Sequence, residues 1–304
     1  MRDMLVLGGG PAGVTAAIYA HRFGLDVAIL TLDIGGQPNL TTDIENYPGF
    51  PIIKGIDFSK KLKEHLEYFN IPVEYKEVQG IEKKDGYFVV KTSDGDYEAK
   101  TVIIALGRKP KKLEVPGESE FEGRGVSYCA VCDGFFFKGK IIAVVGGGDA
   151  AVIDALHMAG IAQKVYLIHR RQEFRAAKIL VDRLKQKNNV ELVLDSVVKE
   201  IKGDKLVKSV VVENVKTGEK REIALDGVFI AIGSVPNTCC IEGFLEVNER
   251  KEIIVNDRQE TSVPGVYAAG DVTNFPHKQI VIAEGQGAVA ATEAFIYLSR
   301  SGSK

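Results

Sequence analysis

Two cysteines separated by two residues, Cys129 and Cys132, are the side chains of this sequence best suited to chemistry. Such a pair can close a small reducible ring, and a dithiol lowers the pKa of its nucleophilic member enough to supply thiolate near neutral pH. The pair could instead form half of a zinc site. The other two cysteines, Cys239 and Cys240, are adjacent, and no His-x3-5-His follows. The pattern therefore favours a redox couple and no metal.

Glycine-rich turns lie on both sides of the dithiol. The first, Gly8-x-Gly10-x-x-Gly13, follows an apolar strand expected over residues 4–7 and opens a helix expected over 12–23. Its glycines permit a tight turn and close backbone approach, while the helix N-terminus offers unpaired N–H groups to a pyrophosphate. This strand-turn-helix context predicts a dinucleotide site.

Further segments are expected to contact the same nucleotide. An acidic residue that accepts the ribose hydroxyls is expected about 20 residues after the turn, and Asp33 comes slightly late for it. Either Asp33 reaches back to the ribose, or the ribose is held by hydroxyl, backbone and water contacts. Residues 35–37 and 45–50 belong to a loop too long for a simple connector, which indicates either a ligand-lining loop or an ordinary surface loop. Asp271, after Gly270, could accept bonds from a cofactor hydroxyl or only cap the helix expected over 283–294.

The second glycine turn has a different continuation. A strand expected over 140–145 leads into Gly-Gly-Gly-Asp-Ala-Ala at 146–151, and a further strand is expected over 164–168. The sequence His-Arg-Arg-x-x-x-Arg then occupies 169–175 in place of an acidic ribose acceptor. Guanidinium groups suit a 2′-phosphate, which a carboxylate would repel. We therefore expect NADPH rather than NADH, the alternative being a solvated basic face.

An internal repeat accounts for the two turns. Residues 101–107 and 227–233 are similar apolar strands that end in glycine, and each lies downstream of one turn. Two copies of one nucleotide-binding design predict an α/β fold with domain boundaries near 112–114 and 235–238. A chain of 304 residues is also long for one compact core.

Composition excludes several classes of protein. The 39 basic and 41 acidic residues give a net charge of −2, without the positive field that nucleic acid or anionic lipid selects. No apolar run approaches the ~18 residues of a membrane span. Because a glycine-interrupted strand is expected directly after residues 1–4, we expect no secretory leader. Four cysteines are too few for a secreted disulfide scaffold. We expect a cytoplasmic globular protein.

Together these motifs resemble those of the low-molecular-weight thioredoxin reductases, over almost the whole chain. Related ferredoxin-NADP reductase-like flavoproteins share the nucleotide motifs but lack the dithiol, so the resemblance is specific. The segments that carry it are 8–13, 35–37, 45–49, 129–133, 169–175 and 270–271.

The resemblance implies two Rossmann-like domains, the second inserted in the first. FAD would bind a domain made of residues 1–112 and 238–304, and residues 113–237 would form an NADPH-binding domain that carries the dithiol. A homodimer and a large domain rotation during the cycle are also implied. NADPH would reduce FAD, FAD would reduce the disulfide, and the dithiol would reduce thioredoxin or a similar small redox protein.

Residue roles follow from the same resemblance. Cys132 resembles the sulfur next to the flavin, Cys129 the sulfur that attacks the protein disulfide, and Asp133 the acid that manages the thiol protons. The residues expected to bind FAD are Gly8, Gly10, Pro11, Ala12, Gly13, Thr31, Gly36, Gln37, Asn46, Ala105, Gly107, Gly270, Asp271, Gln279 and Ile280. Those expected to bind NADPH are Gly146, Gly148, Asp149, Ala150, His169, Arg170, Arg171, Arg175, Ile232 and Gly233.

The chain departs from the family at three places. Ala150 stands where a serine is usual, with changed residues further along that helix, and Lys278 stands where an arginine is more usual. Cys239 and Cys240 match no family role and are expected to be free thiols. Two rival hypotheses therefore stay open: a flavin dithiol enzyme that uses ferredoxin as donor or oxygen as acceptor, and a nucleotide-responsive binding module with a structural disulfide.

Overall fold

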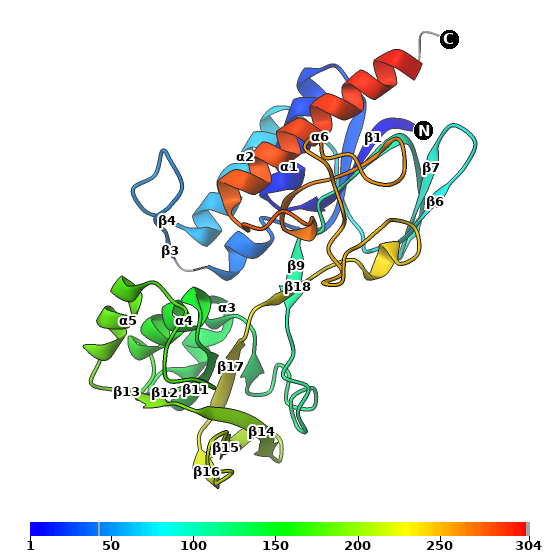
Figure 1. Ribbon diagram of the computed structural model, residues 1–304. Coiled ribbons are helices and arrows are strands. Elements are labelled where there is room, and N and C mark those ends of the chain that lie inside the picture. The colour runs from blue at the N-terminus through cyan, green and yellow to red at the C-terminus, as the bar shows by residue number, and fades with distance from the viewer. Residues whose placement is uncertain (42, 302–304) are drawn as a thin grey trace. The chain divides into compact units, whose positions relative to one another are not determined.

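The computed structural model describes residues 1–41 and 43–301 of the chain. The chain forms two compact units, Met1–Lys109 with Val235–Lys304, and Pro110–Ser234 (Figure 1). Each unit has its own sheet and helices, and the fold class expected from the sequence is confirmed. The two crossings between units are β9 (Arg108–Pro110) and β18 (Ser234–Pro236), which pair with each other.

The first unit is built on a sheet in the order β5-β2-β1-β8-β7-β6, with β19 paired to β8. The pairs of β1 with β2 and β8, of β2 with β5 and of β8 with β19 are parallel, whereas β6, β7 and β8 pair antiparallel. The strands are β1 (Arg2–Gly9), β2 (Val27–Ile34), β5 (Val73–Tyr75), β6 (Val78–Lys83), β7 (Phe88–Thr92), β8 (Gly95–Ile104) and β19 (Val266–Ala268), with the separate pair β3 (Asp43–Ile44) and β4 (Ile53–Lys54).

Helices of this unit pack closely because their facing residues are small. The alanines that α1 and α6 contribute to one hydrophobic cluster are all buried. An added Cβ at Gly287 would lie 2.2 Å from the carbonyl oxygen of Ala12, so the two helices touch through backbone. The helices are α1 (Pro11–Arg22), α2 (Gly55–Tyr68) and α6 (Ile280–Ser301), with short 3-10 turns η1 (Gln37–Leu40), η3 (Cys239–Ile241) and η4 (Gly270–Val272).

The second unit has a parallel sheet in the order β10-β17-β11-β12-β13 and a three-stranded antiparallel sheet. Its strands are β10 (Val126–Ser127), β11 (Ile141–Gly146), β12 (Lys164–Ile168), β13 (Val190–Val193), β14 (Ser196–Gly203), β15 (Val207–Asn214), β16 (Lys220–Ala224) and β17 (Gly227–Ala231). Its helices are α3 (Ala130–Asp133), η2 (Gly134–Phe137), α4 (Asp149–Ala159) and α5 (Lys178–Lys185). No helix in the described part of the chain is long and apolar enough to span a membrane.

Candidate active site

The first glycine turn is tight on one side and open on the other. Gly8 has φ +110°, and a Cβ there would lie 2.3 Å from the Ala105 carbonyl oxygen. A Cβ at Gly13 would lie 1.9 Å from the Gly8 carbonyl oxygen. At Gly10 the nearest atom would be 3.9 Å away. Because this open side faces the start of α1, whose first N–H groups lack intrahelical partners, the turn fits a nucleotide phosphate.

Thr31 and Asp33 both stabilise the loops around this turn. The buried Thr31 hydroxyl accepts a hydrogen bond from Gly9 N at 2.8 Å and donates to the Asp33 carbonyl at 2.7 Å. The Asp33 carboxylate accepts from Gly36 N at 2.8 Å and from Asn39 Nδ2 at 3.1 Å. The acidic residue next to the expected ribose position therefore holds the following glycine loop in place.

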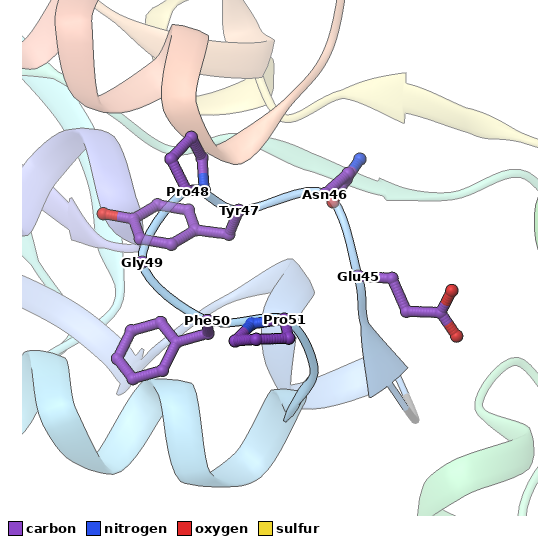
Figure 2. A pocket seen from close by; sticks show the side chains of 7 residues that line it. All are labelled: Glu45, Asn46, Tyr47, Pro48, Gly49, Phe50 and Pro51. Carbon is purple, nitrogen blue, oxygen red and sulfur yellow. The ribbon is translucent and has the colours of Figure 1, made fainter.

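Residues 45–51 line a pocket of their own, shown in Figure 2. Asn46 Nδ2 donates to Gln279 Oε1 at 2.9 Å, so the structure brings these two predicted FAD contacts together. The Tyr47 ring packs edge-on against Phe58 at 4.9 Å. Burial and a hydrogen bond to Glu284 raise the pKa of Tyr47 to about 12. The loop is thus fastened to α2 and to α6.

The remaining predicted FAD contacts gather at the carboxyl ends of the strands. Gly270 begins η4 one residue after the end of β19, and its added Cβ would lie 2.9 Å from Ala12 Cβ at the start of α1. Ala105 follows β8 and donates its N–H to the Leu7 carbonyl at 2.7 Å. Burial raises the pKa of Asp271, an effect that the positive charges of Lys278 and Arg108 oppose. Ligands of open α/β sheets bind at this edge.

The second glycine turn is closed by a histidine. A Cβ at Gly147 would lie 2.1 Å from the His169 ring, which is buried and stacks on Phe174 at 5.1 Å. Burial lowers the pKa of His169, and the positive charges of the neighbouring arginines act in the same direction. A contact between His169 Nε2 and the Glu173 carbonyl, at 3.1 Å, opposes this shift and holds the ring against the turn. Gly148 has no atom within 4 Å of an added Cβ, which leaves the start of α4 open.

The basic segment, residues 169–175, is held against this turn by hydrogen bonds from backbone N–H groups. Arg175 N donates to the Gly147 carbonyl at 2.8 Å, and Ala177 N donates to Asp149 Oδ1 at 2.7 Å. The side chains of Arg170, Arg171 and Arg175 are exposed. Asp149 thus holds the segment before α5, while the arginines stay accessible to an anion. Ala150 is exposed on the first turn of α4, and Ile232 and Gly233 follow β17.

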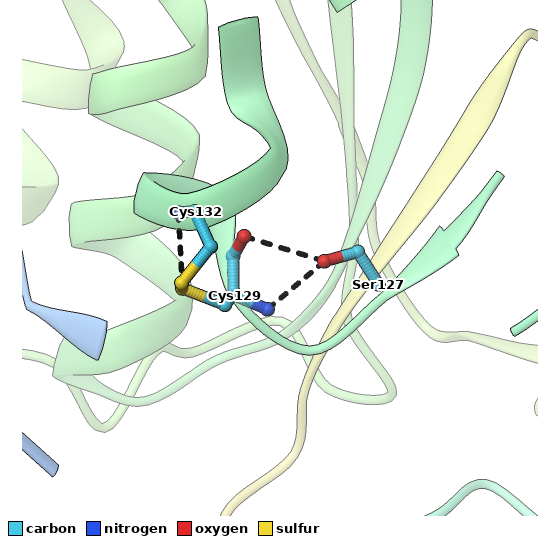
Figure 3. Close-up of a disulfide and its surroundings, with 3 residues drawn as sticks. All are labelled: Ser127, Cys129 and Cys132. Carbon is cyan, nitrogen blue, oxygen red and sulfur yellow. Dashed lines mark hydrogen bonds between the residues drawn. A yellow bond between two sulfur atoms is a disulfide. The ribbon is translucent and has the colours of Figure 1, made fainter. Parts of the chain in front are cut away.

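Cys129 and Cys132 form a disulfide at the start of α3, with a Cα–Cα distance of 5.3 Å (Figure 3). Cys129 Sγ accepts a hydrogen bond from Cys132 N at 3.0 Å. Ser127 Oγ accepts from Cys129 N at 3.0 Å and donates to its carbonyl at 3.3 Å. Cys132 is exposed and Asp133 is half-buried, directly beside it. The disulfide is therefore held in a fixed backbone frame and is open to reagents.

Sequence reasoning missed the residues around the dithiol. Ser127 fixes Cys129, and Gly134 lets η2 approach α4, because its added Cβ would lie 2.9 Å from Met158 Sδ. Phe135 and Phe136 are 76% and 75% exposed directly after the dithiol. Three consecutive phenylalanines after Cys-x-x-Cys-Asp-Gly were the available signal, since large exposed apolar side chains mark interaction surfaces.

The second cysteine pair is reduced. Cys239 is exposed, whereas Cys240 is half-buried, and burial raises its pKa to about 11. Both are free thiols, as expected from the sequence. In the described residues, no group of three or more His, Cys, Asp or Glu side chains could hold a metal ion.

The α/β chain combines a disulfide with two glycine turns of the dinucleotide-binding type, one in each unit. These features are typical of disulfide oxidoreductases that bind two dinucleotides. Residues 2–288 match the pyridine nucleotide-disulphide oxidoreductase family. The chain is 42% identical to thioredoxin reductase of Helicobacter pylori, covering 98% of this chain and 99% of the relative, and 43% identical to that of Bacillus subtilis, covering 97% and 94%. The crystal structure of Lactococcus lactis thioredoxin reductase superimposes with a TM-score of 0.95 at 42% identity, covering 99% of this chain and 100% of the other. The chain belongs to the pyridine nucleotide-disulphide oxidoreductase family, and within it to the low-molecular-weight thioredoxin reductases.

Proposed function

We propose that this protein is an NADPH-dependent, FAD-containing thioredoxin-disulfide reductase. The observation that carries the proposal is the Cys129–Cys132 disulfide, which is exposed at Cys132 and lies in the same unit as the second dinucleotide turn. The relatives named thioredoxin reductase support the choice of substrate. By the same resemblance, FAD is assigned to Met1–Lys109 with Val235–Lys304 and NADPH to Pro110–Ser234. A homodimer in the cytoplasm belongs to the proposal as well.

The chain's own residues account for disulfide exchange. Bound flavin would supply two electrons, taken from the nicotinamide as hydride, to the Cys129–Cys132 disulfide. The Cys129 thiolate then attacks one sulfur of the partner's disulfide, which forms a mixed disulfide and releases a partner thiolate. The Cys132 thiolate attacks Cys129 Sγ, which reforms the ring and releases the second partner thiolate. Asp133, directly beside Cys132, is assigned to proton delivery to these thiolates.

The exposed aromatic pair supports a protein as the electron acceptor. Phe135 and Phe136 lie edge to face, with ring centroids 6.3 Å apart, and immediately follow the dithiol segment. We expect Phe135→Ala/Phe136→Ala to raise the KM for thioredoxin about tenfold or more, because buried aromatic contacts dominate interface energies. Reduction of a small aromatic disulfide should keep its KM. Steady-state kinetics with both acceptors checks this, and equal losses with both would contradict a docking role.

The arginine cluster is proposed to set the preference for NADPH. Removing Arg170 and Arg171 together should raise the KM for NADPH about 100-fold, because each charge-assisted contact to phosphate contributes on the order of 1.5–3 kcal/mol. The KM for NADH should change little. Arg183→Ala is the matched control, since this arginine is exposed on α5 of the same unit. Kinetics with both nucleotides test the assignment, and parallel changes for NADPH and NADH would refute it.

A further inference from the structure

Glu252 is a buried carboxylate between two cations in the first unit. Its side chain is 9% exposed, and its Oε1 lies 3.0 Å from Arg108 Nη1 and 3.5 Å from Lys278 Nζ. Asn248 Nδ2 donates to Oε2 at 2.9 Å. Burial raises the pKa of Glu252, but Asn248, Lys278 and Arg108 together outweigh burial and lower it. Glu252 is therefore an anion at neutral pH, with each oxygen in a polar contact.

Both cations also reach the same backbone turn. Lys278 Nζ donates to the Thr273 carbonyl at 2.6 Å, and Arg108 Nη1 lies 3.4 Å from the Asp271 carbonyl. Between these carbonyls, the Val272 carbonyl accepts from the N–H of Ile253, the residue after Glu252, at 3.0 Å. One carboxylate oxygen thus connects, through two cations, to both sides of the turn that carries Asp271.

The same network extends to a second predicted cofactor loop. The Arg108 carbonyl accepts a hydrogen bond from Gln37 Nε2 at 2.8 Å. Lys278 directly precedes Gln279 and the start of α6. Three segments that are distant in sequence and that are each expected to contact FAD therefore depend on the positions of Arg108 and Lys278.

We propose that Glu252 is a positioning residue of the FAD site, acting through Arg108 and Lys278 to fix the Gly270–Thr273 turn and the carboxylate of Asp271. The inference rests on the proposed assignment of FAD to this unit. A neutral side chain of equal size would keep the packing but remove the Glu252 charge from two half-buried cations, which leaves the carboxylate of Asp271 as the anion coupled to both. Lys278, the more exposed of the two cations, would then turn toward water and release the Thr273 carbonyl.

The test measures FAD binding, independently of turnover. Apoprotein prepared by removing FAD is titrated with FAD, and binding is followed by quenching of flavin fluorescence. Glu252→Gln should weaken FAD binding about tenfold, which corresponds to about 1.4 kcal/mol, because the two cations lose the carboxylate that orients them. Glu242→Gln is the matched control: its partner Lys251 lies 3.6 Å away, with both side chains more than 70% exposed, and its FAD affinity should equal that of the wild type.

A double variant tests whether Glu252 acts through the lysine. If it does, Glu252→Gln combined with Lys278→Met binds FAD no more weakly than the weaker single variant, because both changes break one connection. Wild-type affinity in Glu252→Gln, or losses that multiply in the double variant, would overturn the inference. If wild-type apoprotein failed to rebind FAD, that result would overturn both the cofactor assignment and the inference about Glu252. Should Glu252→Gln not fold, Lys278→Met alone should give the same loss of affinity.

Discussion

Cys132→Ser is expected to lower kcat/KM for NADPH-dependent thioredoxin reduction by about three orders of magnitude or more, because serine cannot form the disulfide through which electrons leave the flavin. Reduction of the flavin by NADPH should survive, since its nucleotide turns are untouched. The expected result is therefore a variant in which NADPH still reduces the flavin in a single turnover. Thioredoxin should not reoxidise that reduced flavin. Stopped-flow absorbance separates the two half-reactions.

The matched control for this variant is Cys239→Ser. Cys239 is a free, exposed thiol on the first unit, outside the Cys129–Cys132 ring. Its replacement should leave both half-reactions at the wild-type rate. Sustained NADPH-dependent reduction of thioredoxin by Cys132→Ser would contradict the dithiol relay, and so would equal losses in both serine variants.

Gly13→Ala is expected to give a protein that does not retain FAD and is less stable. The added Cβ would lie 1.9 Å from the Gly8 carbonyl oxygen and 3.0 Å from its carbon, so the backbone of the turn must move. Overpacking against backbone in a closely packed site costs about 3 kcal/mol. The flavin-to-protein absorbance ratio after purification and the free energy of unfolding check the two effects.

Gly285→Ala provides the control for this substitution. Gly285 lies in α6, and no atom lies within 4 Å of an added Cβ. Alanine there should stabilise the helix by up to about 1 kcal/mol and leave FAD bound. If Gly13→Ala retained FAD and unfolded like this control, the glycine turn would not be the cofactor cradle.

Local patterns predicted the elements that carry the motifs. The strand expected over 164–168 is β12, and the strands before both glycine turns and the helix after the first begin within two residues of their expected starts. The helix expected over 283–294 instead runs from Ile280 to Ser301 as α6. Its C-terminal extension packs Phe295 on Phe23 of the segment after α1, with ring centroids 4.9 Å apart. That contact joins residues far apart in sequence, so the composition of the helix alone could not reveal it.

The pairing of Cys129 with Cys132 was predictable because its chemistry follows from spacing, and the disulfide confirms it. The role of the basic segment after β12 stays a prediction. The candidate site was not predictable where distant residues meet. Glu252 lies in no motif, and its role depends on Arg108 and Lys278. Arg108 begins β9 and Lys278 lies just before α6, so both come from segments distant in sequence. In the sequence, Lys278 stands out only as a departure from the family pattern. The structure gives this lysine a carboxylate and a carbonyl as partners.

The most direct test of the central claim is an anaerobic titration of the purified protein with NADPH, followed by oxidised thioredoxin, while the flavin absorbance is recorded. The account predicts that NADPH bleaches the flavin band, that NADH does so poorly at equal concentration, and that thioredoxin restores the band. A flavin that NADPH leaves oxidised, or a reduced flavin that thioredoxin leaves bleached, would contradict it.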